Sequence, residues 1–300
     1  MSAPAPVALF AERPDWHTGR LLAALEAEGR VGCIVPLSRC GFAIGESAQE
    51  SVHGLILPGF EDQLPAAAFV RTVPNGSTQE ITLRLGVLHA LGALGVKVVN
   101  SARAIERCVD KAMTSFLIAR AGLPTPRTFV LQDRAPAQAL VDAAPGDTVL
   151  KPLFGSQGRG LLRLSPRTDL PEAEAVEGVF YLQDFVPRAE GLHADYRVFV
   201  VGGRAEAAMR RVNEDWITNI HQGAEGEPVP ATGPLADLAV AAALAVGAQV
   251  AGVDLIRDRD GSLLVLEVNS MPAWNGLYGA TGQDMAAPIA ALLCGVPQPA

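Results

Sequence analysis

The sequence predicts an open α/β lobe followed by an α+β half that is rich in β-hairpins. Over residues 1–100, short apolar runs with β-branched residues alternate with helical patterns, which is typical of a parallel sheet with helical connections. Further along, Gly202-Gly203 and Asp260-Gly261 each separate two strand-like runs, and both pairs favour the tight turns of antiparallel hairpins.

In the α/β lobe, the helical runs Arg20–Glu28 and Gln79–Leu94 are each followed by a glycine, which favours a helix C-terminus. No GxGxxG follows the first strand, so a dinucleotide fingerprint is absent. In the second half, helices are expected over Ser101–Ala121 and Leu235–Val250. The expected strands are Val7–Phe10, Val31–Leu37, Gly54–Leu57, Ala67–Val70, Val96–Val99, Asp147–Pro152, Gly160–Leu164, Val179–Val186, Tyr196–Val201 and Arg204–Met209.

Composition places the chain among soluble, cytoplasmic proteins. It is 49% hydrophobic and 19% charged, and its net charge of −8 argues against a nucleic-acid partner. The apolar run Ala236–Val253 carries Asp237 and Gln249, which favours a buried helix over a membrane span. The four cysteines form no CxxC pair, so we expect reduced thiols rather than zinc ligands or disulfides.

The second hairpin brings two carboxylates together. If Asp260-Gly261 is a two-residue turn, Asp254 lies opposite Glu267, with Cβ atoms roughly 5 Å apart, and Asn269 shares their face. Like charges this close are costly unless they are paired, and a hard cation such as Mg²⁺ suits this set of oxygens. The alternative is a surface hairpin with both acids in water; the apolar neighbours Val265 and Val268 favour the metal site.

A glycine-rich loop follows Lys151, one of three lysines in the chain. Glycine lets backbone N–H groups approach phosphate oxygens closely, and a lysine supplies positive charge. The loop carries Gly155, Ser156 and Gly158, but it has no GK[ST] sequence and is therefore not a Walker loop. Alone, it is equally well explained as a simple turn. Lys111 is a second candidate for a phosphate contact, although a solvated helix position explains it as well.

Three further groups are weaker candidates. Asp184, Phe185 and Val186 end a strand whose edge suits an adenine ring, or they belong to an ordinary core strand. Arg210 and Arg211, adjacent at a strand end and followed by Asn219, suit phosphate or oxyanion contacts. Arg71 follows an N-terminal strand and is suggested as a substrate-carboxylate contact.

Taken in order, these features resemble the ATP-grasp superfamily and its RimK-like glutamate ligases. The resemblance implies an ATP-grasp fold with a Rossmann-like N-terminal domain (1–100), a lid with connecting helices (101–187) and a C-terminal core (188–300). It covers most of the chain from Asn100 to Trp274, in the stretches VDKAMTSFLIARAGLPTPRTFV, VLKPLFGSQGRGLLRL, YLQDFV, DYRVFVVGGRAEAAMRR, TNIHQG, AGVDLI and LEVNSMPAW.

The resemblance also implies ATP and Mg²⁺ (or Mn²⁺) as cofactors and assigns roles to the candidates. Lys111, Lys151 and the loop with Gly155, Ser156 and Gly158 would meet the phosphates; Asp184, Phe185 and Val186 adenine; Asp195 the ribose; Asp254, Glu267 and Asn269 the metal. Arg211 aligns with an arginine near an acyl-phosphate, whereas the two-residue turn places Arg210 opposite Asp195; both assignments stay open. Ile217 stands where the family favours arginine, which leaves the contact there in question, although Asn219 is retained.

Segments around Thr82–Ala90, Asn100–Cys108 and Asn269–Trp274 are similar to a RimK-like branch linked to glutamylation of pterin or furan cofactors. The expected reaction phosphorylates a carboxylate with ATP and then forms an amide with L-glutamate. A protein or peptide acceptor, another ATP-grasp branch and a non-catalytic ATP-binding scaffold are the alternatives. A homo-oligomer, dimer or tetramer, is expected by analogy.

Overall fold

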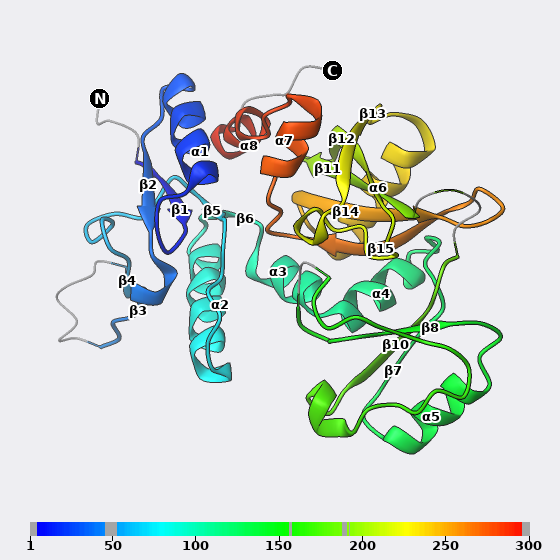
Figure 1. The fold of residues 1–300 in the computed structure, drawn as a ribbon. Coiled ribbons are helices and arrows are strands. Elements are labelled where there is room, and N and C mark those ends of the chain that lie inside the picture. The colour runs from blue at the N-terminus through cyan, green and yellow to red at the C-terminus, as the bar shows by residue number, and fades with distance from the viewer. Residues whose placement is uncertain (1–4, 46–52, 156–157, 188–190, 192, 296–300) are drawn as a thin grey trace.

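The structure is a computed structural model that describes residues 5–45, 53–155, 158–187, 191 and 193–295. Three regions are evident in Figure 1: an N-terminal lobe in blue and cyan, a green lid and a yellow-to-red core. Each of the three larger sheets lies in one of these regions. The predicted domain boundaries themselves stay a prediction. Among the described residues, no helix is long and apolar enough to span a membrane.

The N-terminal lobe is the predicted parallel sheet with helices on both faces. Its strand order is β2 (Gly32–Val35), β1 (Val7–Phe10), β5 (Ala67–Val70), β6 (Lys97–Val99). Helices α1 (Trp16–Ala27) and α8 (Ala286–Cys294) cover one face, and α2 (Thr78–Ala93) covers the other. The expected strand at Gly54–Leu57 forms β4 (Leu55–Ile56), which pairs with β3 (Gly41–Phe42) outside the main sheet.

The helix expected over Ser101–Ala121 is two helices, α3 (Ala102–Val109) and α4 (Lys111–Arg120). Asp110 separates them because its backbone is extended (ψ 99°) and its side chain accepts from the N–H groups of Ala112 and Met113. A side chain that caps a helix in this way starts a new helix. Lys111 is therefore the first residue of α4, beside the lid.

The lid is a four-stranded antiparallel sheet below the core in Figure 1, with the order β7 (Thr128–Leu131), β10 (Phe180–Asp184), β8 (Thr148–Lys151), β9 (Leu162–Leu164). Helix α5 (Arg134–Asp142) packs on one face through Ala137 and Val141. Its small apolar core is separate from the others, so the lid is a distinct packing unit. The short η2 turn (Ala173–Val176) completes it.

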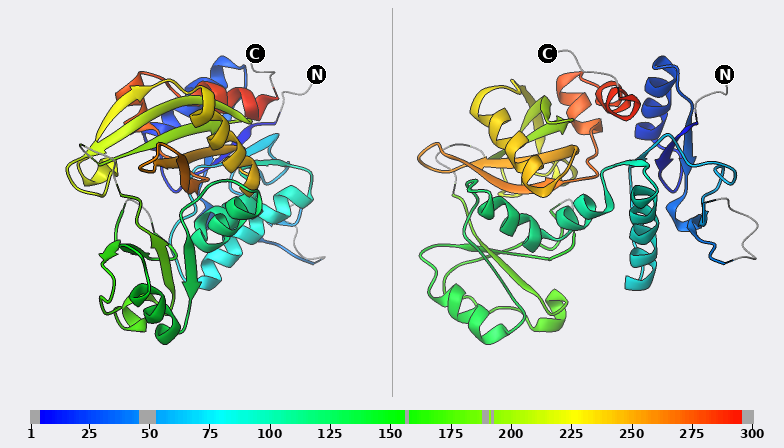
Figure 2. Two further views of the ribbon diagram at one scale, coloured as in Figure 1. Left: turned by 90° about the vertical axis from the view of Figure 1, so that its right-hand side faces the viewer. Right: turned by 180° about the vertical axis from the view of Figure 1, so that it is seen from behind.

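The core is a five-stranded antiparallel sheet, as the two turn signals predict. Its order is β13 (Glu225–Val229), β12 (Arg204–Asn213), β11 (His193–Val201), β14 (Val250–Arg257), β15 (Leu263–Asn269). Helix α6 (Gly233–Val246) covers one face, and α7 (Asn275–Thr281) with α8 covers the other, seen from two sides in Figure 2. Two short 3₁₀ turns, η1 (Leu37–Arg39) and η3 (Ile220–Gln222), lie in loops.

Asn100 ties the N-terminal lobe to the core. It is fully buried, and its Nδ2 donates to the carbonyls of Val250 (2.7 Å) and Ser270 (2.6 Å). Its Oδ1 accepts from the N–H groups of Gln249 and Val250 at 2.7 and 3.0 Å. One side chain thus satisfies buried backbone groups at the start of β14 and just after β15, and both ends of that hairpin are held against the N-terminal lobe.

Candidate active site

The β14–β15 hairpin places Asp254 opposite Glu267 and Gly252 opposite Asn269, as predicted, although the predicted turn is wrong. The Asp258 N–H bonds to the Ser262 carbonyl at 2.9 Å and Arg257 pairs with Leu263, so three residues, not two, form the turn. A β-bulge after Asp254 then shifts the register by one residue. The longer turn and the bulge cancel, which restores the predicted pairing.

The β11–β12 hairpin has the predicted Gly202-Gly203 turn, with Val201 opposite Arg204. A bulge between Val200 and Phe199 shifts the register by one residue for Phe199 and all pairs farther from the turn. Arg211 and not Arg210 therefore lies opposite Asp195. Arg210 contacts Glu227 at 3.2 Å on the surface. The two-residue turn therefore gives the wrong partner for Asp195, and the bulge is the reason.

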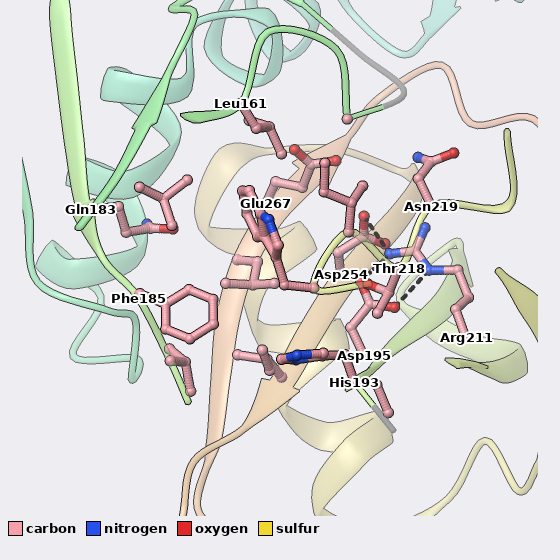
Figure 3. Close-up of a pocket in the computed structure, with 18 of the residues that line it drawn as sticks. Leu161, Gln183, Phe185, His193, Asp195, Arg211, Thr218, Asn219, Asp254 and Glu267 are labelled. Carbon is pink, nitrogen blue, oxygen red and sulfur yellow. Dashed lines mark hydrogen bonds and ion pairs between the residues drawn. The ribbon is translucent and has the colours of Figure 1, made fainter. Parts of the chain in front are cut away.

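Asp195, Arg211, Asp254 and Arg197 form a row of alternating charges, in which the first three are buried and Arg197 is partly exposed. Arg211 Nε donates to Asp195 at 2.7 Å and its Nη2 lies 3.0 Å from Asp254 (Figure 3). On the other side, Nε and Nη2 of Arg197 each donate to Asp254 at 2.6 Å. Burial acts to raise the pKa of Asp254, but the two arginines outweigh it and hold the pKa below its ordinary value. Asp254 is consequently a carboxylate at any pH near neutrality.

The predicted metal ligands fit a magnesium ion in their chemistry. Asp254 and Glu267 face each other, and Asn269 Nδ2 donates to Glu267 Oε1 at 2.9 Å. Oxygen donors from carboxylates and an amide are the ligands that Mg²⁺ takes, alongside substrate phosphates. No group of three or more His, Cys, Asp or Glu side chains in the described parts of the chain forms a metal cluster. The amide and a phosphate would therefore have to complete the coordination.

A pocket lies where the lid faces the core. Figure 3 shows Gln183 and Phe185 entering it from the lid, and Asp254 and Glu267 from the core hairpin. Lys111, Gly155, Asn269 and Arg71 do not line it, and Ser156 lies outside the described residues. The predicted residues that do line it are Lys151, Gly158, Asp184, Phe185, Val186, Asp195, Arg211, Asn219, Asp254 and Glu267.

Lys151 is held in this pocket by Gln183, which the sequence analysis did not single out. Its Nζ donates to Gln183 Oε1 at 2.6 Å, and Gln183 in turn donates to Thr128 Oγ1 at 3.0 Å. Burial lowers the pKa of Lys151 to about 8, although the carboxylates of Glu267 and Asp254 act to raise it. Lys111 Nζ donates to the carbonyls of Leu153 and Gly155 at 3.3 and 2.8 Å, so it holds the start of the glycine-rich loop.

At the other end of the pocket, the adenine site expected at the end of strand β10 stays a prediction. Strand β10 is an inner strand, and the N–H groups of Asp184 and Phe185 already bond to carbonyls at 2.9 Å. The Asp184 carboxylate accepts two hydrogen bonds from the Arg127 guanidinium. An apolar wall is also available to a base: the Phe185 ring lies 6.0 Å from Trp216 between centroids and packs under the Arg163 guanidinium at 3.8 Å. Val186 lines the same wall.

The glycine-rich loop touches the core at Ile217. Gly158 adopts a left-handed conformation (φ 70°), and a Cβ there would lie 2.8 Å from Ile217 Cγ2. Asn219 lines the pocket beside this contact and caps η3 through the N–H of His221. Ile217, which departs from the resembled pattern, thus makes an apolar contact with the loop.

The chain as a whole is similar to known proteins. The sequence profile of the RimK-like ATP-grasp domain matches residues 108–293, more than half of the chain. The chain belongs to the RimK-like ATP-grasp family. A tetrahydromethanopterin:alpha-L-glutamate ligase of Methanococcus maripaludis is 35% identical over 285 residues, which cover 93% of this chain and 94% of that protein. A probable alpha-L-glutamate ligase of Trichodesmium erythraeum is 31% identical, over 94% of each chain.

Solved structures show the same fold for this RimK-like chain. The ATP-grasp ligase PsnB complexed with a minimal precursor has a TM-score of 0.75 at 24% identity, covering 97% of this chain and 99% of that one. A RimK domain ATP-grasp protein from Sphaerobacter thermophilus has a TM-score of 0.69 at 22% identity, covering 96% and 99%. The predicted ATP-grasp fold is confirmed, and the chain is an enzyme of the carboxylate–amine ligase type.

Proposed function

We propose that this ligase uses ATP and Mg²⁺ to join L-glutamate to a carboxylate of a pterin-bearing cofactor. The observation that carries the proposal is one pocket in which Lys151, Arg211, Asp254 and Glu267 meet between lid and core. The relatives named tetrahydromethanopterin:alpha-L-glutamate ligase, which match over most of the chain, support glutamate and a pterin as the substrates.

The position of each residue in the pocket suggests which part of the nucleotide it would contact. Lys151 and Gly158 line the part of the pocket where the ATP phosphates would enter, and Lys111 holds the carbonyl of Gly155 at the start of the loop. The apolar wall of Phe185, Val186 and Trp216 would take adenine. Asp184 supports that wall through its ion pair with Arg127. Asp195 lines the pocket, where the resemblance places the ribose, and at the same time orients Arg211. Asn219 would make a polar contact with the nucleotide.

Asp254, Glu267 and Asn269 would hold Mg²⁺, which neutralises charge on the ATP phosphates. In the reaction, an acceptor carboxylate oxygen attacks the γ-phosphorus and ADP leaves with the electron pair of the broken P–O bond. The glutamate amine then attacks the acyl carbon, phosphate leaves and the amine loses a proton. Arg211, fixed by two carboxylates, would stabilise the developing negative charge, and the Gly158–Ile217 contact would keep water out.

The test is ADP release from ATP and Mg²⁺ with L-glutamate and a panel of acceptors, with products identified by mass spectrometry. Glutamate-dependent ADP release and one added glutamyl unit on a pterin cofactor support the proposal. Addition of glutamate to short acidic peptides instead would mean that the acceptor is a peptide and not a pterin cofactor. Binding of ATP without any ADP release would mean that the protein is a non-catalytic scaffold and not a ligase.

Three finer expectations belong to the same proposal. We expect Mn²⁺ to replace Mg²⁺, because both ions accept oxygen ligands. We also expect a homo-oligomer, dimer or tetramer, in the cytoplasm, since closed symmetric assemblies are the commonest form of soluble oligomer. Light scattering on the purified chain measures the oligomeric state directly, and a monomer would contradict the expected homo-oligomer.

A further inference from the structure

Arg71 is a buried cation without a charge partner. Among the described residues, three arginines are buried: Arg71 and Arg84, each 8% exposed, and Arg211, 3% exposed. Arg84 is paired with Glu80 at 3.3 Å, and Arg211 contacts both Asp195 and Asp254. Within the described parts of the chain, no carboxylate lies within 4.0 Å of Arg71. Buried charges in proteins are normally paired directly, whereas Asp15, the carboxylate that acts to raise the pKa of Arg71 against the effect of burial, makes no ion pair with this guanidinium.

The hydrogen bonds of Arg71 are also incomplete. Nη1 donates to the Met271 carbonyl at 3.3 Å, while Nε is buried without an acceptor in the described structure. Arg84, at the same exposure, donates to the carbonyls of Pro74 and Asn75 as well as to Glu80. The contrast between two equally buried arginines shows that burial alone does not explain Arg71.

The neighbour of Nη2, His17, does not accept its hydrogen. The Trp274 N–H donates to His17 Nε2 at 3.2 Å, so a neutral imidazole must carry its proton on Nδ1. Nδ1 is then a donor, directed at Asp15 Oδ2 3.4 Å away, and it cannot accept from Arg71 Nη2 at 3.4 Å. The Nε and Nη2 edge of Arg71 therefore presents two donors in the spacing that matches a carboxylate.

Arg71 lies at the carboxyl end of β5, where ligands of parallel sheets bind. Its contact, Met271, is two residues beyond the candidate metal ligand Asn269, yet Arg71 does not line the nucleotide pocket. The Trp274 ring lies 5.9 Å from the Arg71 guanidinium carbon.

We propose that Arg71 binds the α-carboxylate of the amino-acid substrate. This inference rests on the proposed ligase function. The α-carboxylate is two bonds from the attacking amine, so its receptor must lie near the metal ligands, and Arg71 contacts Met271, two residues beyond Asn269. His17, fixed by Trp274 and Asp15, leaves the Nε and Nη2 edge of Arg71 free for the incoming anion.

The experiment compares Arg71→Met and Arg71→Lys with the matched control Arg84→Met. We expect the KM for L-glutamate to rise about 100-fold in Arg71→Met and less in Arg71→Lys, with the KM for ATP unchanged. Arg84→Met should keep the KM for L-glutamate and lower Tm, because it loses the bonds to Pro74, Asn75 and Glu80, whereas Arg71→Met loses only the bond to Met271 and should lower Tm less. The α-amide of glutamate should be a poor substrate for the wild type, and Arg71→Met should lose the preference for glutamate over it.

A KM for L-glutamate within twofold of wild type in Arg71→Met would overturn this inference and leave the ligase function standing. A rise confined to the KM of the acceptor would overturn it as well, because Arg71 would then hold the other substrate. If the wild type releases no glutamate-dependent ADP with any acceptor, the proposed function itself fails, and the inference fails with it.

Discussion

Arg197 donates one hydrogen bond of 2.6 Å to each carboxylate oxygen of Asp254. Its Nη2 also lies 3.9 Å from Glu267, so one guanidinium lies against both acidic side chains of the candidate metal site. A cation bound there must share these oxygens with Arg197. Arg197 therefore compensates the charge of the site in the absence of a metal ion.

Replacing Arg197 with Met should strengthen metal binding in the absence of nucleotide. Removing one positive charge a few ångströms from a divalent cation should raise the affinity by about tenfold or more, even with strong screening. Free Mn²⁺, counted by electron paramagnetic resonance during a titration, measures this without any turnover. Arg210→Met, which loses the exposed pair with Glu227, is the control and should leave the affinity unchanged. Equal or weaker binding in Arg197→Met contradicts the idea.

Asp254→Ala and Glu267→Ala should each abolish ADP formation, because each removes a proposed metal ligand. Their stabilities should differ. Asp254→Ala removes the carboxylate that Arg197 and Arg211 share, which leaves Arg211 with Asp195 alone, and should lower the free energy of unfolding by about 3 kcal/mol. Glu267→Ala should lower the free energy of unfolding much less, because the Glu267 side chain is 37% exposed. Urea unfolding and ADP release measure the two effects, and full activity in both variants would remove the metal assignment.

The affinity for ATP should fall as the pH rises through the pKa of Lys151. Burial lowers that pKa to about 8, so Lys151 is charged at lower pH and loses its proton above it. Only the charged form attracts phosphate, so we expect the KM for ATP to rise about tenfold between about pH 7 and about pH 9. Arg keeps its charge throughout this range, so Lys151→Arg should give a flatter profile. The same slope in both proteins would show that another group titrates.

Gly158→Ala should weaken ATP binding by displacing the lid loop from Ile217. The new methyl group would lie 2.8 Å from Ile217 Cγ2, and we expect the KM for ATP to rise about tenfold. Gly203→Ala is the matched control, because Gly203 has a similar φ of 82° but nothing within 4 Å of an added Cβ. It should cost stability alone. Ile217→Ala in the same chain as Gly158→Ala should restore the KM, and failure to do so would mean that backbone strain is the cause.

Local patterns predicted most of the secondary structure, because strands such as β1 and β5 are short apolar runs with turn residues on both sides. The opposition of Asp254 and Glu267 was also predictable, but partly by compensation. Neither the three-residue turn nor the bulge leaves a clear mark in the sequence, and their effects on register cancel. In the β11–β12 hairpin nothing compensates the single bulge, so the partner that the two-residue turn predicted for Asp195, Arg210, was wrong.

The remaining parts of the site depend on contacts between distant segments. Arg197 meets Asp254 only because β11 lies beside β14, and sequence order does not give that neighbour. His17 and Trp274 are 257 residues apart, so neither suggests the other. Gln183 was overlooked because a lone amide in an apolar strand carries no signal until its neighbour Lys151 is known. The break between α3 and α4 differs, because Asp110 before Lys111 is a local capping signal. The sequence therefore carried enough information to predict this break, although a single helix was expected.

The four hydrogen bonds of Asn100 have a practical meaning for exchanging parts between related ligases. Because this amide contacts only main-chain groups of the core, a related N-terminal lobe that ends in an asparagine at this position can keep these four bonds. A chimera joined after Ser101 takes that asparagine from the grafted lobe, and the grafted lobe must also match the packing of α1 on α8 and the bond between Trp274 and His17. Substrate preference carried by the N-terminal lobe would then be transferable as a module.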